Sequence, residues 1–438
     1  MVAFLAVFLV YYQLFYLSES QAHILIMLAN TVVMIIFNQK IFPDKLSTLR
    51  SYVGINYTYN HMRRFIVCPL CHSLYTKEQA ESFLLCKSLK FGSICGGTIM
   101  ETVNGKKSYI GKVAAFNDIK HTLTVMFSRP GFESLLESWR YRTRHQDTMY
   151  DIYDGQLWSE FKDKNGHVFT EKERSLLFTL NVDWFQSSKQ TTYSVGAVYL
   201  TINNLPRHLR YRKENIILVC LMPGPTEPDT TQIHNYLQVM VNELNELYYG
   251  EFYRCTFKSP AVPVQIRAAL FLVACDIPAS RKVSGFTSFN ATIPCNKCSS
   301  AYPARANTSL QRNYASTLRH CDRWVRRTNE SNRQQAINWK NACSQDAREK
   351  LEKKFGTRYS ALHNLAYFDI VRCTAVDPMH GLFLGTAKRM VHIWRTYTNK
   401  YTNTVYLPDT DIKNMQAEAN QVVLPQQYTP VHQKIGSL

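Results

Sequence analysis

Residues 271–298, FLVACDIPASRKVSGFTSFNATIPCNKC, decide the predicted fold and the predicted chemistry of the chain. An apolar run from Ala268 to Cys275 ends at a single acid, Asp276. A short apolar run of this kind is typical of a buried strand. The Cys-x2-Cys pair Cys295 and Cys298 follows, at a spacing that suits two thiolates on one metal ion. The stretch therefore predicts an acid at the end of a buried strand, followed by a metal-binding loop.

The segment before this stretch alternates short apolar runs with turn residues. Three runs are strand-like and a fourth has one apolar stripe at helical spacing: Leu176–Val182, Val195–Ile202, Ile216–Leu221 and Gln232–Tyr249. Three strands, a helix and a further apolar element are the order expected of a domain with a mixed sheet. We therefore predict an α+β fold that is built on a mixed sheet.

Asp183 follows the first strand-like run, just as Asp276 follows the last. Phosphoryl transfer with two metal ions needs carboxylates from separate elements, because hard divalent cations prefer oxygen ligands. With Arg281 and Lys282 beside Asp276, the pattern indicates phosphate chemistry. The alternative for each acid taken alone is a helix cap or a turn former.

Four cysteines near the amino terminus form a second candidate metal site. Cys68, Cys71, Cys86 and Cys95 follow the pattern C-x2-C-x14-C-x8-C, with turn residues between them. Four thiolates would close a tetrahedral zinc site and leave no position for water, so the zinc would be structural. We therefore predict a region like a zinc ribbon. The alternative is a set of unrelated core cysteines.

The charge balance points to a polyanionic partner. The chain of 438 residues has 51 Lys and Arg against 33 Asp and Glu, a net charge of +18. Such an excess favours nucleic acid as a partner, although many basic proteins bind none. A hydrophobic fraction of 45% excludes disorder over most of the chain. The two Cys-x2-Cys pairs indicate a reducing compartment, the cytosol or the nucleus.

Two apolar segments, Met1–Leu17 and Ala22–Phe37, begin the chain. The first is about long enough for a signal sequence or a short membrane span. It lacks a basic start and a clear cleavage site, and tyrosines interrupt it. We therefore expect two amphipathic helices, packed on each other or on a missing partner, and no membrane partner. A membrane-anchored zinc protein is the alternative.

Seven segments carry a resemblance to a known family. They are NVDWF (181–185), NNLPRHLR (203–210), ILVCLMPGPTEPD (217–229), YLQVMVNELNELY (236–248), RAALFLVACDIPASRKVSGF (267–286), PCNKC (294–298) and VDPMHGLFLGTAKRM (376–390). In this order they resemble the transposase of CACTA-type DNA transposons, in the form found in fungal genomes. The resemblance extends from about Cys68 to the carboxyl terminus.

The resemblance implies a cut-and-paste DNA transposase of the DDE/D superfamily with an RNase H-like catalytic domain. In such a domain an acidic triad binds two Mg²⁺ or Mn²⁺ ions. Asp183 is then the first acid and Asp276 the second, and Asp377 is the nearest candidate for the third. The alternative role for Asp377 is to orient His380. The implied partners are transposon ends and target DNA, with a possible homo-oligomer, and the implied location is nuclear.

The resemblance also implies a structural zinc element that is formed by Cys295, Cys298 and His380. Between the pair and the histidine, the sequence becomes polar and basic. Trp324 stands there among Arg323, Arg326 and Arg327, a composition that suits DNA contact as well as a solvated helix.

We expect the chain to divide into six segments. These are an apolar helical segment (1–60), a zinc-ribbon-like region (61–110), a basic helical region (111–171), the first part of the RNase H-like core (172–298), a basic helical insertion (299–375) and a truncated carboxyl-terminal part of the core (376–438). If the third acid is missing, the alternative is an inactive, transposase-derived DNA-binding protein.

Overall fold

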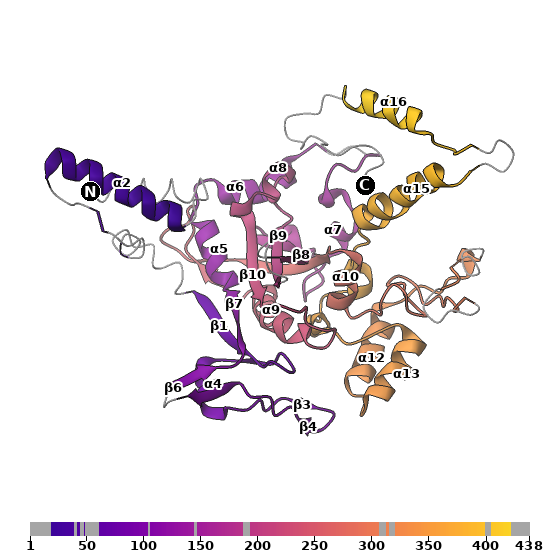
Figure 1. Ribbon diagram of the computed structural model, residues 1–438, viewed down its shortest axis with the longest axis horizontal. Helices are drawn as coiled ribbons and strands as arrows, with labels where there is room; N and C mark the ends of the chain where they lie inside the picture. The colour runs from indigo at the N-terminus through magenta and orange to yellow at the C-terminus, as the bar shows by residue number, and fades with distance from the viewer. Residues whose placement is uncertain are drawn as a thin grey trace.

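The computed structural model describes residues 19–38, 42–43, 48, 61–103, 106–143, 147–186, 193–305, 312–314, 320–398 and 404–421 (Figure 1). A seven-stranded mixed sheet lies at its centre, and helices pack on it. The predicted α+β class with a mixed sheet is therefore confirmed. The expectation for Met1–Leu17 concerns residues outside the described ones.

The central sheet has the strand order β13-β8-β9-β10-β7-β1-β2. Its strands are Met62–Val67 (β1), Leu74–Tyr75 (β2), Lys112–Asn117 (β7), Ser175–Gln186 (β8), Ser194–Ile202 (β9), Ile216–Met222 (β10) and Arg267–Val273 (β13). Only β13 runs parallel to its neighbour, β8, whereas all other neighbouring pairs in this sheet are antiparallel.

Helix α9 (Ile233–Tyr249) makes the parallel pairing possible, because it carries the chain from β10 back to the far edge of the sheet. Its apolar stripe, which includes Leu237 and Leu244, is buried against the sheet. The helix ends at Gly250, whose φ of 78° favours glycine. The predicted helix over residues 232–249 is thus confirmed.

Short helices and hairpins surround the sheet. The α-helices are Glu19–Phe37 (α2), Lys77–Phe83 (α4), Ile119–Phe127 (α5), Phe132–Glu137 (α6), Gln156–Glu160 (α7), Arg207–Arg210 (α8), Ile277–Ser284 (α10), Asn329–Lys340 (α12), Gln345–Phe355 (α13), Ile370–Cys373 (α14), Lys388–Thr396 (α15) and Asp409–Ala419 (α16). Two-stranded sheets join Leu89–Lys90 (β3) to Ser93–Ile94 (β4), Met100–Val103 (β5) to Lys106–Tyr109 (β6) and Tyr253–Arg254 (β11) to Val264–Gln265 (β12).

The described residues also include helical turns of other types. They are the 3-10 turns Ser138–Tyr141 (η2), Ile152–Asp154 (η3), Phe169–Glu171 (η4), Lys213–Asn215 (η5), Cys321–Arg323 (η6) and Ala361–Asn364 (η7), and the π-helix Met379–Ala387 (η8).

Two local expectations differ from the structure. Residues 112–117, which we expected to be helical, form β7, because Ala114 and Phe116 alternate with more exposed neighbours and point into the core. Asp183 was expected at the end of a strand. Strand β8 continues to Gln186, however, and Asp183 pairs with Ala197 inside it.

The segment after α10 leaves the sheet and later returns to it. Helices α12 and α13 pack against each other in this excursion, and α14 then brings the chain back beside β13. The later elements η8, α15 and α16 have no buried residues, and α15 and α16 extend from the body (Figure 1). Within the described ranges, no helix combines the length and the apolar character that a membrane span requires.

A buried ion pair lies where β13 begins. The guanidinium of Arg267 lies 3.3 Å from the carboxylate of Asp163, and both side chains are at least nine-tenths buried. Arg267 also donates to the carbonyl of Phe169 (2.8 Å) and to the hydroxyl of Ser175. The pair therefore ties the loop before β8 to the first residue of β13.

We predict that Asp163→Asn lowers the free energy of unfolding by about 3 kcal/mol, because it leaves the buried Arg267 without a compensating charge. Urea unfolding measures this loss. The matched control is Asp322→Asn, since Asp322 is exposed and lies 3.9 Å from the exposed Arg323. The control should change stability by less than about 0.5 kcal/mol. Equal effects of the two substitutions would contradict a structural role for the pair.

Candidate active site and metal centre

Asp183 inside β8 and Asp276 just after β13 have the same offset from one pair of residues on these parallel strands. Leu180 pairs with Val273 in the β8–β13 register, and each acid is the third residue after its member of that pair. The alignment continues past the strand, because the amide of Ala274 donates to the carbonyl of Leu180 (2.9 Å). The two acids therefore follow the same end of this strand pair, and the charges of both act on His380.

A third acid repeats this offset on a third parallel segment. Thr374 forms an isolated parallel bridge with Val273, and the amide of Ala375 donates to the carbonyl of Val273 (2.9 Å). Asp377 is the third residue after Thr374. The structure thus brings Asp377 to the end of the sheet at which Asp276 lies.

Each of the three acids has one oxygen held by a backbone amide. Asp183 accepts from the amide of Trp184 (2.8 Å), Asp276 from Ala279 (2.7 Å) and Asp377 from Met379 (2.8 Å). For Asp276 this bond is the amino-terminal cap of α10. Among the described residues, the second oxygen of Asp183 and of Asp276 has no hydrogen-bond partner. These oxygens are therefore free to bind a cation.

His380 belongs to this acid cluster. Its Nδ1 hydrogen-bonds to the second oxygen of Asp377. This bond, together with the charges of Asp276 and Asp183, raises the pKa of His380 above its usual value. Burial acts to raise the pKa of Asp377, but the hydrogen bonds from His380 and Met379 outweigh it and hold that pKa below its usual range. The pair therefore favours an ionised Asp377.

The acids suit hard divalent cations by their chemistry. Oxygen ligands from three separate segments are the set that Mg²⁺ and Mn²⁺ prefer. The three carboxylates do not all lie within 4.8 Å of one another, as the ligands of a single ion would. A two-metal site spreads its ligands over two ions about 3.5–4 Å apart, so it does not require all three carboxylates to lie so close together.

The four cysteines of the amino-terminal region come together. The ligand atoms of Cys68, Cys71, Cys86 and Cys95 all lie within 4.8 Å of one another. The Sγ atoms of Cys68 and Cys95 are 3.8 Å apart, and those of Cys71 and Cys86 are 3.4 Å apart. Tetrahedral zinc with Zn–S bonds of about 2.3 Å requires sulfur atoms about 3.8 Å apart. The cluster can therefore hold a zinc ion, and it is compatible with a zinc-ribbon-like region.

Two turns deliver these cysteines. The first pair lies in the turn between β1 and β2, where the amide of Cys68 donates to the carbonyl of Ser73 (3.0 Å). The second pair flanks the β3–β4 hairpin, where the amide of Cys86 donates to the carbonyl of Gly97 (2.7 Å). A Cβ atom at Gly97 would lie 3.0 Å from the Sγ of Cys68, so glycine allows the two turns to approach closely.

Polar groups contact the thiols of the cluster, and such contacts lower the pKa of Cys71. The hydroxyl of Tyr75 lies 3.1 Å from the Sγ of Cys86. Burial acts to raise the pKa of Cys71, but hydrogen bonds with Ser73 and with the adjacent thiols lower it to about 7. A thiol with this pKa loses its proton readily, as metal binding requires.

We predict that Cys86→Ser lowers the zinc content of the purified protein by about one ion per chain, because a closed site needs all four thiolates. Inductively coupled plasma mass spectrometry measures the content. Cys255→Ser is the matched control, since Cys255 is exposed and lies outside the cluster. Loss of zinc from both variants, or from neither, would contradict the assignment.

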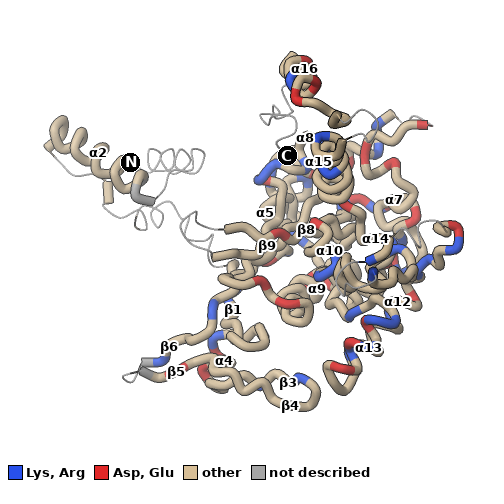
Figure 2. The backbone as a smooth tube through the Cα atoms, turned by 45° about the vertical axis from the view of Figure 1, so that its right-hand side comes forward, with Lys and Arg blue, Asp and Glu red and all other residues tan. Residues whose placement is uncertain are grey.

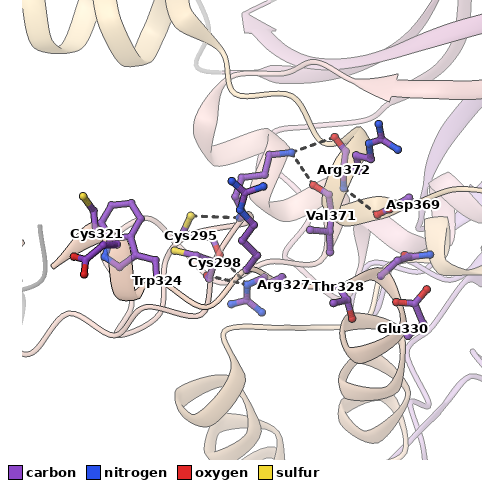
Figure 3. Close-up of a pocket in the computed structure, with 14 residues that line it drawn as sticks. Cys295, Cys298, Cys321, Trp324, Arg327, Thr328, Glu330, Asp369, Val371 and Arg372 are labelled. Carbon is purple, nitrogen blue, oxygen red and sulfur yellow. Dashed lines mark hydrogen bonds between the residues drawn. The ribbon is translucent and has the colours of Figure 1, made fainter. Parts of the chain in front are cut away.

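Cys295 and Cys298 line a cavity of about 880 Å³, together with Cys321 and Trp324 (Figure 3). The amide of Lys297 donates to the Sγ of Cys295 (3.3 Å), a bond that suits a thiolate. His380 does not line this cavity, and in the described part of the chain these side chains form no group of three ligands within 4.8 Å. The structure places His380 with the acids instead. Metal binding by the cysteine pair stays a prediction.

Lys297, between the two cysteines, holds the segment that presents Asp377. Its ammonium donates to three carbonyls, those of Val371 (2.7 Å), Arg372 (3.2 Å) and Thr374 (2.8 Å). Figure 3 shows the bonds to Val371 and Arg372 as dashed lines at the end of α14. Through Lys297, the Cys-x2-Cys loop therefore holds in place the segment that leads back to the sheet.

Arg327 is a structural residue, although we expected it on the basic surface. Its side chain is buried, and it donates to the carbonyls of Cys295 (3.0 Å) and Cys298 (3.1 Å) and to the hydroxyl of Thr357 (2.9 Å). Burial lowers the pKa of Arg327 to about 10. The neighbouring Arg326 is exposed.

Sequence reasoning missed several residues that shape these sites. Lys297 lies inside the quoted PCNKC motif, between two candidate metal ligands. That position could have marked it as a residue of the site. Nothing in the local pattern marks Tyr75 as a neighbour of Cys86, because the contact depends on the pairing of β1 with β2. Gly97 stands next to Gly96, and the pattern does not distinguish their roles.

We predict that Lys297→Met lowers the free energy of unfolding by about 1–3 kcal/mol, because it leaves carbonyl groups without a donor. Thermal and urea unfolding measure the change. Lys353→Met provides the comparison, because Lys353 is exposed on α13 and the substitution there should be nearly neutral. A neutral Lys297→Met would show that the bonds of Lys297 do not stabilise the fold.

Comparison with known proteins supports a transposase family. Residues 147–353 match the family model described as transposase family tnp2, a range that covers just under half of the chain. The matched range contains Asp183, Asp276, Cys295 and Cys298, and it ends before Asp377. No curated protein matches the chain. A transposase family implies DNA as a partner.

Proposed function

We propose that the chain is the transposase of a CACTA-type DNA transposon and that its sheet is an RNase H-like catalytic core. The observation that supports this proposal is a shared offset. Leu180, Val273 and Thr374 pair in one row across the sheet. Asp183, Asp276 and Asp377 are each the third residue after a member of that row. Along the chain, the antiparallel strands β8, β9 and β10 are followed by α9 and by the parallel strand β13, which is the predicted order of elements. The tnp2 match covers these elements.

The proposed reaction is hydrolysis of one strand at a transposon end, followed by attack of the freed 3′-hydroxyl on target DNA. Asp183, Asp276 and Asp377 would hold two Mg²⁺ or Mn²⁺ ions. When bound, such ions activate the attacking oxygen and stabilise the leaving oxygen. The protein supplies ligands at fixed positions, because catalysis of this type depends on the alignment of the two oxygens with phosphorus.

The three acids differ in how firmly they are held. Asp276 caps α10, so its orientation follows that of the helix. Asp377 is held through both oxygens, by Met379 and by His380. Asp183 is exposed on β8, with one oxygen free. Two acids thus provide a rigid frame, and Asp183 faces the solvent from which DNA must approach.

We predict that Asp183→Asn and Asp276→Asn each slow the cleavage of labelled transposon-end DNA in Mn²⁺ by about 1,000-fold, equivalent to about 4 kcal/mol of activation free energy. Each substitution keeps the shape of the side chain and removes its charge. Denaturing gel electrophoresis of the products measures the rate.

Asp322→Asn is the matched control for this assay, because Asp322 is exposed and lies outside the acid cluster. Its rate should equal that of the unsubstituted protein. If both cluster variants cleave at the unsubstituted rate, the acids are not catalytic. If no form cleaves but DNA still binds, the chain is a transposase-derived DNA-binding protein.

The location and the assembly follow from the same proposal. A protein that acts on chromosomal DNA works in the nucleus, and a fluorescent fusion tests this location. Joining two transposon ends favours a homo-oligomer, which sedimentation with end DNA would detect. The four-cysteine cluster is proposed as a structural zinc site, because four thiolates leave no position for substrate.

A further inference from the structure

A second cavity, which none of the three acids lines, lies between the four-cysteine region and the helical excursion. Its volume is about 680 Å³. One wall is the segment Ser88–Gly92 of the β3–β4 hairpin, and the other is the turn Lys340–Cys343 between α12 and α13 together with Arg348. Figures 1 and 2 both show the hairpin beside these two helices.

Arg348 joins the two walls. Its guanidinium lies over the ring of Phe91 (4.4 Å to the ring centre) and over the ring of Trp339 (4.3 Å). It also donates to the carbonyls of Trp339 and Lys340, both at 3.3 Å. Arg348 therefore links the hairpin to the two helices across the cleft.

The floor of the cleft is tied to the cysteine centre. The side chain of Asn235, near the start of α9, donates to the carbonyl of Cys71 (3.1 Å), and that of Gln232 donates to the carbonyl of Leu70 (3.0 Å). Both Cys71 and Asn235 line the cavity. The cleft is therefore built from three parts of the chain that are mutually fixed.

The lining of this cleft is cationic. Lys90, Lys340 and Arg348 contribute positive charge, and no Asp or Glu lies among the lining residues. Lys90 and Lys340 are exposed, and the ammonium of Lys340 lies over the ring of Tyr359 (4.2 Å). The larger cavity beside Cys295 differs, because three acids offset the cations in its lining.

Two acids outside the lining interact with its cations, Glu352 with Arg348 and Asp229 with Lys90. Asp229 is also engaged in hydrogen bonds. Its carboxylate accepts from the amides of Thr231 (2.6 Å) and Gln232 (2.8 Å). Burial acts to raise its pKa, but these bonds and the charge of Lys90 hold the pKa below its usual range. Asp229 therefore serves the start of α9 and offsets part of the charge of Lys90, while the lining itself keeps an excess of positive charge.

We propose that this cleft binds the phosphate backbone of duplex DNA, at a site separate from the acid cluster. The inference rests on the proposed function, since it takes DNA as the substrate and adds where a second stretch of it lies. Lys90 and Lys340 each pair with a phosphate, and the side-chain amide of Asn341 donates to a phosphate oxygen. Contacts of this kind carry no sequence information, so the cleft positions DNA of any sequence.

The test is the salt dependence of binding. Fluorescence anisotropy with a labelled 30-base-pair duplex is recorded from about 50 to 200 mM KCl, with zinc present and with no magnesium or manganese. Each phosphate contact contributes about 0.9 to the slope of log affinity against log salt. We predict that the double substitution Lys90→Gln with Lys340→Gln makes this slope shallower by about 2.

Two matched variants accompany this measurement. Lys90→Arg with Lys340→Arg keeps both charges and should keep the slope of the unsubstituted protein. Lys162→Gln with Lys164→Gln removes two exposed charges outside the cleft and should also leave the slope unchanged. Equal zinc content and equal melting temperature establish that every variant is folded.

The outcomes separate the cleft from the proposed function. If the Lys→Gln pair at the cleft keeps the original slope, DNA does not bind there, although strand cleavage that needs Asp183 would still support the transposase. If the Lys162 and Lys164 pair changes the slope equally, the effect is one of net charge and the cleft is not a site. If the unsubstituted protein binds no duplex, both proposals fail.

Discussion

The parallel register of β8 with β13 is the constraint on which the candidate active site depends. Leu180, Val273 and Thr374 form one row of paired residues, and the three acids lie beyond that row by the same number of positions. A slip of one residue would turn a strand's side chains to the opposite face of the sheet. The buried row therefore determines the position of the polar residues beyond it. Helix α9 secures the register, because it packs on β13 from one side.

Local pattern predicted much of this arrangement. The strands near residues 176–182, 195–202 and 216–221, the helix at 233–249 and the grouping of four cysteines are all present. What the pattern could not show depends on contacts between distant residues. Residues 112–117 form a strand because β1 and β10 flank them. Arg327 is buried because Cys295 and Cys298 expose carbonyls to it. The bond between His380 and Asp377 orients that histidine within the acid cluster.

The two cysteine pairs of the C-x2-C type occupy comparable positions relative to the sheet. The first turns the chain from β1 to β2 at one edge of the sheet. The second lies beside the segment that bridges to β13 at the other edge. In each case a short cysteine-bearing loop supports an edge where the backbone has few sheet partners. Edge segments are the parts of a sheet that most need such support, because one side of the backbone is unpaired.

The bridge between Val273 and Thr374 has a consequence for how Asp377 is positioned. Roughly a hundred residues separate the two partners, and closing a flexible loop of that length costs about 4 kcal/mol in chain entropy. The folded excursion, with α12 packed on α13, and the bonds from Lys297 to Val371 and Thr374 hold the two partners together in the native state. Asp377 therefore reaches the other two acids only through this long crossing of the chain. The position of this acid is therefore set by the fold of the excursion as much as by the sheet itself.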